Sequence, residues 1–229
     1  MDGDFILRMF GQILTGLPLT LNFWVLSLAG GGILALILNL MRTTRIGNAV
    51  AASYIFVFRG TPLLIQIFMI YYGLAGFGFI RQSVLWPFLR EPYWCALLAL
   101  ILNDAAYTAE ILRGGLKAVP SGLVEAGRVG GMTRGMVLRR ITLPIAIRQA
   151  LPAYSNEIIS MLKATALVST ITLMDMTGIA RAAMSETWRA VEILLCAAVI
   201  YLVVSLIVTR LTALVERRLS PWQFAGSAA

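Results

Sequence analysis

The sequence of 229 residues contains no histidine, only two cysteines and few charged residues. Without histidine, the chain lacks the commonest metal ligand and the commonest proton shuttle near neutral pH. Cys95 and Cys196 lie inside apolar runs, where a thiol behaves as a small hydrophobic group, so neither a disulfide nor a metal site is indicated. No Gly-x-x-x-x-Gly-Lys-Ser/Thr pattern occurs, and the serines have no histidine base. We therefore expect no cofactor, no nucleotide site and no enzymatic activity in this chain.

The chain is instead rich in apolar sequence. Hydrophobic residues make up 59% and charged residues 13%, and the mean hydropathy of +0.83 is far outside the usual range of soluble proteins. Several apolar runs approach or exceed the ~20 residues that an α-helix needs to cross a bilayer. We therefore predict an all-α, polytopic membrane protein with a single transmembrane domain over residues 1–229.

Five apolar segments predict five transmembrane helices, at about residues 14–41, 62–80, 93–111, 151–173 and 191–214. Residues 49–58 are too few to cross a bilayer, and they predict a short helix on or in the membrane interface. Thr61 is a good N-cap and Pro62 a good first helical residue, so the second span is expected to begin there. Residues 175–189 predict a short amphipathic piece before the last span.

The basic residues predict the orientation of the chain. With five spans, thirteen of them fall on one side: Arg42, Arg45, Arg59, Arg113, Lys117, Arg128, Arg134, Arg139, Arg140, Arg148, Arg210, Arg217 and Arg218. Five fall on the other side: Arg8, Arg81, Arg90, Arg181 and Arg189; the nineteenth, Lys163, is left out because it lies inside a predicted span. Basic loops stay in the cytoplasm, so we predict the N-terminus outside and the C-terminus inside. The net charge of +8 is then an orientation signal rather than a sign of nucleic-acid binding.

The expected cytoplasmic loop, about residues 112–150, begins with a predicted helix. Pro120 and Ser121 can open this helix, and Glu125 falls in its early part, where a carboxylate favours the positive end of the helix dipole. Ala126 and Gly127 leave one face of the helix nearly bare.

A second short helix is predicted in the same loop. Gly130 and Gly131 end the first helix, and Thr133 can cap another that carries Arg134 and stops at Pro144. Physical reasoning alone leaves two interpretations open. The loop either only enforces topology through its basic residues, or it docks its bare face into a groove on a soluble partner.

The spacing in this loop resembles a known signature. Glu125-Ala126, Gly131 six residues after the glutamate, and the later Pro144 are similar to the EAA motif of membrane subunits of ABC importers. In that family the loop forms coupling helices that fit a cleft in the ATPase subunit, and Gly127 stands where the family usually has a second alanine. The resemblance implies the following coupling residues: Glu125, Ala126, Gly127, Gly130, Gly131, Met132 and Arg134.

The resemblance extends over nearly the whole chain. Residues 59–64, 102–111 and 151–157 look like the polar amino acid subgroup of these permeases, and the last is similar to subunits that carry histidine, lysine, arginine, ornithine or basic opines. The resemblance implies the type I importer fold in a bacterial inner membrane. It also implies a paralogous membrane subunit or a self-dimer, two ATPase subunits and an extracytoplasmic solute-binding protein. The alternative is a secondary transporter or channel for polar amino acids that needs no ATPase.

Charged residues inside the predicted spans indicate a polar substrate. A charge near the bilayer centre costs about 2.5 to 3.5 kcal/mol on insertion scales, so Asp104 and Glu157 need compensation. Either they bind neighbouring helices, or they face a cavity and meet a cationic substrate group. We expect the second, with these substrate contacts: Glu157, Asn156, Asp104, Asn103, Tyr107 and Gln66.

Overall fold

The computed structural model describes residues 3–219, and in them the backbone forms helices joined by turns, with no strand. The α-helices are α1 Gly3–Leu14, α2 Leu17–Met41, α3 Arg45–Gly60, α4 Leu63–Phe68, α5 Gly78–Arg81, α6 Trp86–Leu89, α7 Pro92–Lys117, α8 Ser121–Val129, α9 Arg134–Val137, α10 Leu143–Ala164, α11 Met176–Thr187 and α12 Ala190–Leu219. The all-α prediction is confirmed.

Three helical segments within residues 3–219 are long and apolar enough to cross a membrane: Gly3–Met41, Pro92–Lys117 and Ala190–Leu219. Two bent helix pairs raise this number to as many as five. One pair joins α3 to the helical segment Leu63–Gly76 at 105°, and the other joins the segment Arg134–Ile171 to α11 at 47°. Five crossings and their exact limits stay predictions.

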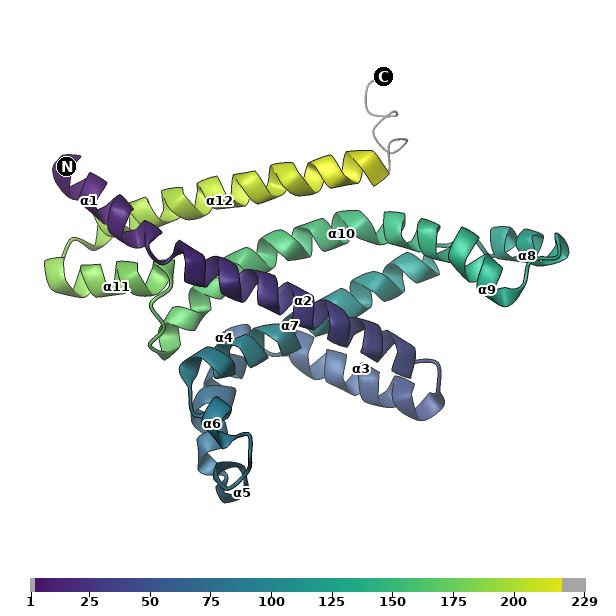
Figure 1. Cartoon of the computed structure of the whole chain (residues 1–229), viewed down its shortest axis with the longest axis horizontal. Coiled ribbons are helices and arrows are strands. Elements are labelled where there is room, and N and C mark those ends of the chain that lie inside the picture. Colours follow the sequence, from purple (N-terminus) through teal and green to yellow (C-terminus); the bar gives the residue numbers. More distant parts are fainter. Residues whose placement is uncertain (1–2, 220–229) are drawn as a thin grey trace.

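The long helices α2, α7, α10 and α12 run broadly along the long axis of the molecule (Figure 1). Helices α8 and α9 lie at one end of this axis, and α1 and α11 lie at the other end (Figure 1). Helix α7 is the structural centre, since it packs against α2, α3, α4 and α10.

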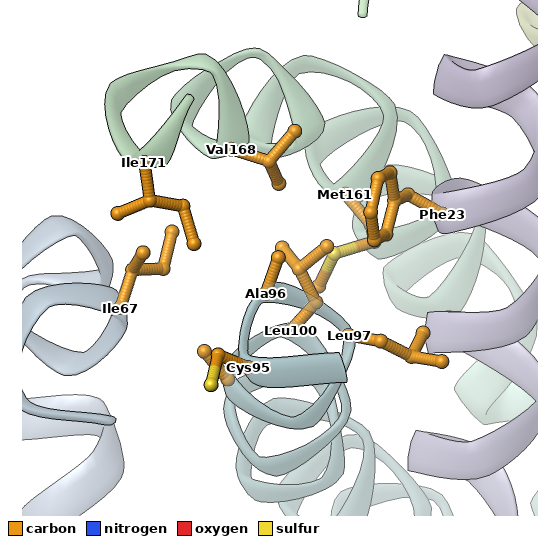
Figure 2. Packing of buried hydrophobic residues seen from close by; sticks show 10 residues of the cluster. Phe23, Ile67, Cys95, Ala96, Leu97, Leu100, Met161, Val168 and Ile171 are labelled. Atoms are coloured by element: carbon orange, nitrogen blue, oxygen red, sulfur yellow. The ribbon is translucent and has the colours of Figure 1, made fainter. Parts of the chain in front are cut away.

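A core of apolar side chains joins α2, α4, α7 and α10 with the 3₁₀ helix Thr165–Ile171. Figure 2 shows Phe23, Ile67, Met161 and Val168 around Leu100 of α7. All five are buried. Lipid tails are as apolar as these side chains, so close packing rather than exclusion of water favours the association of such helices.

Small residues let α2 and α7 approach closely. A Cβ on Gly31 would overlap the carboxylate of Asp104, and a Cβ on Gly30 would press on Ile101. Gly32 faces open space. Asn39 strengthens the same contact by donating a hydrogen bond of 3.0 Å to the carbonyl oxygen of Ala109.

The helix expected at residues 49–58 is present as α3, and its place at the membrane interface stays a prediction. Helix α3 is longer, and it packs Ala51 and Ile55 against α2 and α7. The Tyr54 hydroxyl also donates a hydrogen bond of 2.6 Å to the carbonyl oxygen of Leu102. The alanines of α7 leave room for this further helix beside it.

The junction between α3 and α4 also differs from the prediction. Thr61 is the C-cap of α3, and Pro62 is the N-cap of α4, which therefore begins one residue later than expected. The Thr61 hydroxyl donates back to the carbonyl oxygen of Val57 at 2.8 Å. The expected span at 62–80 is shorter, because α4 continues through a π-helical turn at residues 69–73 and a 3₁₀ turn at residues 74–76 and the helical segment ends there.

The segment between α7 and α10 is shorter than the expected loop of 112–150. Helix α7 continues to Lys117, and α10 begins at Leu143. Pro144 does not stop a helix, because α9 continues through a π-helical turn at residues 138–142 into α10. Pro144 sits in the first turn of α10, where its missing N–H is tolerated.

Candidate functional site

A cavity of about 600 Å³ lies where α3 ends and α4 begins, beside α7 and α10. We call it the central cavity. Its polar and charged lining residues are Arg59, Thr61, Asn103, Tyr107, Glu157 and Ser160. Three of the six predicted substrate contacts, Asn103, Tyr107 and Glu157, are therefore brought together on its walls.

Helical periodicity explains this gathering. Asn103 and Tyr107 are four residues apart on α7, so they lie on one face of that helix. Glu157, Ser160 and Ala164 share a face of α10 for the same reason. The last turn of α3 and the bend that follows it form another wall of the cavity.

Arg59 is a cavity residue that the sequence analysis missed. It was counted with the cytoplasmic basic residues, but it lines the central cavity at the end of α3. Its guanidinium carbon lies 5.1 Å from the centre of the Tyr107 ring, within the range of a cation–π interaction. Without Arg59 the count is twelve against five, and the predicted orientation is unchanged.

The central cavity thus holds one acidic and one basic side chain, Glu157 and Arg59. The basic side chain that faces the same cavity as Glu157 comes from another helix, so the spacing within one helix could not indicate it. A cavity with both charges can bind a zwitterion, since each charge of the ligand meets an opposite one.

Gln66 does not line the central cavity, but it forms hydrogen bonds with residues at the cavity wall. Its side-chain amide nitrogen donates hydrogen bonds to the carbonyl oxygens of Phe58 at 2.8 Å and Thr61 at 3.0 Å. Its amide oxygen accepts a hydrogen bond of 3.1 Å from Asn103. Gln66 therefore stabilises the break between α3 and α4, and it orients Asn103.

Asp104 and Asn156 are not among the residues that line the central cavity. Asp104 is fully buried against Gly31 of α2, and one carboxylate oxygen accepts a hydrogen bond of 3.3 Å from Thr108. The other carboxylate oxygen is buried without a hydrogen-bond partner. Asn156 is exposed on α10. Their position inside apolar spans suggested a place in the cavity, but the rotation of each helix turns them away from it.

The predicted pair of short helices is present as α8 and α9, at one end of the molecule (Figure 1). Helix α8 begins at Ser121, and Gly130 is its C-cap. Gly131 has φ +81°, a left-handed conformation that favours glycine. Thr133 caps α9 by accepting a hydrogen bond of 3.3 Å from the Met136 amide.

The predicted coupling residues divide by exposure. Glu125, Ala126, Gly130, Gly131 and Arg134 are exposed, whereas Met132 is half-buried and Gly127 is buried.

Gly127 faces the inside of this helix pair. A Cβ at this position would lie 2.7 Å from the terminal methyl carbon of Ile141 and 3.4 Å from a methyl carbon of Val137. The bare face expected from sequence is therefore divided, with Ala126 facing outward and Gly127 facing inward.

An apolar helical bundle with a mixed-charge cavity and an exposed helix pair at one end suits a membrane transport protein. Residues 6–221 match the family described as the inner membrane component of binding-protein-dependent transport systems. The chain belongs to this family.

Relatives cover nearly the whole chain. It is 55% identical to the octopine transport system permease protein OccM of Rhizobium meliloti over 222 residues, which are 96% of this chain and 91% of the relative. It is 45% identical to the nopaline transport system permease protein NocM of Agrobacterium fabrum, covering 96% and 93%. It is 39% identical to the histidine/lysine/arginine/ornithine permease protein HisM of Escherichia coli K12, covering 91% and 89%. The chain is thus a permease subunit and not an enzyme by itself.

Solved structures show the same fold. An amino acid ABC transporter crystallised with histidines matches with a TM-score of 0.84 and 38% identity, over 95% of this chain and 99% of that chain. The inward-facing methionine ABC transporter MetNI matches with a TM-score of 0.70 over 93% and 98%, but its 18% identity shows the fold alone. The fold is therefore that of ABC transporter permeases.

Proposed function

We propose that this chain is the membrane subunit of an ATP-driven importer for basic amino acids or basic opines. Glu157 in the central cavity is the observation that carries the proposal, because it offers a carboxylate to a cationic side chain. Arg59 on the same cavity wall offers a positive charge to the substrate carboxylate. The names of the octopine, nopaline and histidine/lysine/arginine/ornithine permeases support the same class of substrate.

The partners follow from the family. The chain pairs with a paralogous membrane subunit or with itself, and two ATPase subunits bind the end that carries α8 and α9. A solute-binding protein delivers the substrate to the opposite end. The distribution of basic residues supports α8 and α9 as the cytoplasmic end in a bacterial inner membrane, with the N-terminus outside and the C-terminus inside.

Coupling is assigned to α8 and α9. ATP binding brings the ATPase subunits together, moves the two helices and turns the cavity outward, and hydrolysis resets the complex. Glu125, Ala126 and Arg134 are exposed on this helix pair, which supports a direct contact with the ATPase. The alternative of a transporter without an ATPase has no support from a family of binding-protein-dependent components.

The test is the Glu157→Gln variant in the complete complex, reconstituted in liposomes with its ATPase subunits and binding protein. A hydrogen bond to a charged group contributes about 1.5 to 3 kcal/mol, so ATP-dependent arginine uptake is expected to fall about 10-fold to 150-fold. The Glu186→Gln variant is the matched control, since Glu186 is exposed on α11. Unchanged arginine uptake by an assembled Glu157→Gln complex would show that Glu157 does not bind the substrate cation.

A further inference from the structure

A second cavity of about 430 Å³ adjoins the central one, between α3 and the last turns of α2 and α7. We call it the end cavity. Residues that line it include Arg42, Ala52, Phe56, Arg59, Tyr107 and Glu110. Arg59 and Tyr107 also line the central cavity, so the two cavities share this stacked pair.

A polar track on α7 connects the two cavities. Asn103, Tyr107 and Glu110 are separated by four and then three residues, so they lie on one face of the helix. At 1.5 Å per residue, this track is about 10 Å long. It leads from the central cavity toward the end of α7 that precedes α8.

The end cavity carries an excess of positive charge. Glu110 is its acidic residue, and both carboxylate oxygens are already engaged. One pairs with an Arg42 nitrogen at 2.7 Å, and the other accepts a hydrogen bond of 3.0 Å from Arg113. The Arg42 Nε group is buried without a hydrogen-bond partner. Arg42 and Arg59 both line the cavity, and each guanidinium carries five N–H donors, so the two side chains can together hold an acceptor with negative charge.

We propose that the end cavity is a second binding site for the transported solute, which holds its carboxylate on Arg42 and Arg59. The stacked pair of Arg59 and Tyr107 is the partition between the two cavities, and the solute passes when Arg59 leaves the Tyr107 ring. This inference rests on the proposed function, because it takes the solute to be an amino acid or opine with a carboxylate.

The two cavities differ in the charges they offer. The central cavity offers Glu157 to a cationic side chain, whereas the end cavity offers no free carboxylate and repels a second positive charge. A basic amino acid is therefore held at both ends in the central cavity and by its carboxylate alone in the end cavity. A transport path needs such a weaker site, because the solute must be able to leave.

Cysteine protection tests the second site. Cys95 and Cys196 are replaced by alanine, and Ala52→Cys or Ile46→Cys is introduced on α3 of the complete complex. Ala52 lines the end cavity, whereas Ile46 is 81% exposed on the same helix and is not among its lining residues. Reaction with a charged thiol reagent is measured in inside-out vesicles, with and without arginine.

Arginine at about ten times its dissociation constant is expected to slow the labelling of the A52C variant about 10-fold and to leave that of I46C unchanged. The added substitution Arg42→Gln is expected to abolish the protection. Labelling of A52C at the same rate with and without arginine, in a complex that takes up arginine with ATP, would overturn the second site alone. Absence of ATP-driven uptake by the unmodified complex would overturn the proposed function as well.

Discussion

The Tyr107→Leu substitution tests the partition between the two cavities. Leucine keeps an apolar side chain but removes the aromatic face that lies 5.1 Å from the Arg59 guanidinium. A cation–π interaction contributes about 0.5 kcal/mol at exposed sites and about 2 kcal/mol when desolvated. If Arg59 must leave the ring before solute passes, its loss is expected to accelerate passage about 2-fold to 30-fold.

The assay is the efflux of labelled arginine from preloaded liposomes that contain the complete complex without ATP. The Tyr107→Phe variant is the matched control, because it keeps the ring and removes only the hydroxyl. We expect efflux through Tyr107→Leu to exceed that of the unmodified complex, and Tyr107→Phe to match the unmodified complex. Equal efflux from all three complexes would refute the reasoning.

Three further predictions concern glycines. Gly31→Leu is expected to lower the melting temperature in detergent, because the new side chain overlaps Asp104. Gly32→Leu is the control and is expected to leave the melting temperature unchanged, because Gly32 faces open space. Equal melting temperatures of the two variants would contradict this. Gly127→Ala is expected to keep ATPase binding, since only the end of Ile141 must move and alanine favours the helix by about 1 kcal/mol. Gly127→Leu overpacks the helix pair by about 1 to 3 kcal/mol, and co-purification of the ATPase should fall. Gly131→Glu places a side chain at φ +81°, which costs about 1 to 2 kcal/mol, and should lower arginine uptake per ATP hydrolysed; a native ratio would exclude Gly131 from the coupling residues.

Composition and local pattern were sufficient for the class of protein and for several local elements. The apolar content predicted an all-α membrane protein, and the glycines and Thr133 predicted where α8 ends and what caps α9. These features depend on residues that are close in sequence. Turn conformation and capping involve only a few neighbouring residues, so they can be read without knowledge of the rest of the fold.

Contacts between residues of different helices could not be predicted in this way. Asp104 and Glu157 looked equivalent as acids inside apolar spans, but Asp104 is buried against α2 and Glu157 lines the central cavity. Gln66 was predicted as a substrate contact from its polarity alone, and that pattern did not indicate its hydrogen bonds across the bend after α3. Each difference depends on how one helix is rotated against another, which the spacing within a single helix does not specify.

The sequence by itself determined that the chain is a helical membrane protein with an asymmetric distribution of basic residues. It also determined the presence of a two-helix segment between α7 and α10. Only the tertiary structure decided which polar residues meet. The packing of α3 on α7 places Arg59 beside Tyr107, in the cavity that Glu157 also lines. The physical reason is that periodicity acts over a few residues, whereas a cavity is formed by side chains from segments about 50 to 100 residues apart, whose approach depends on packing.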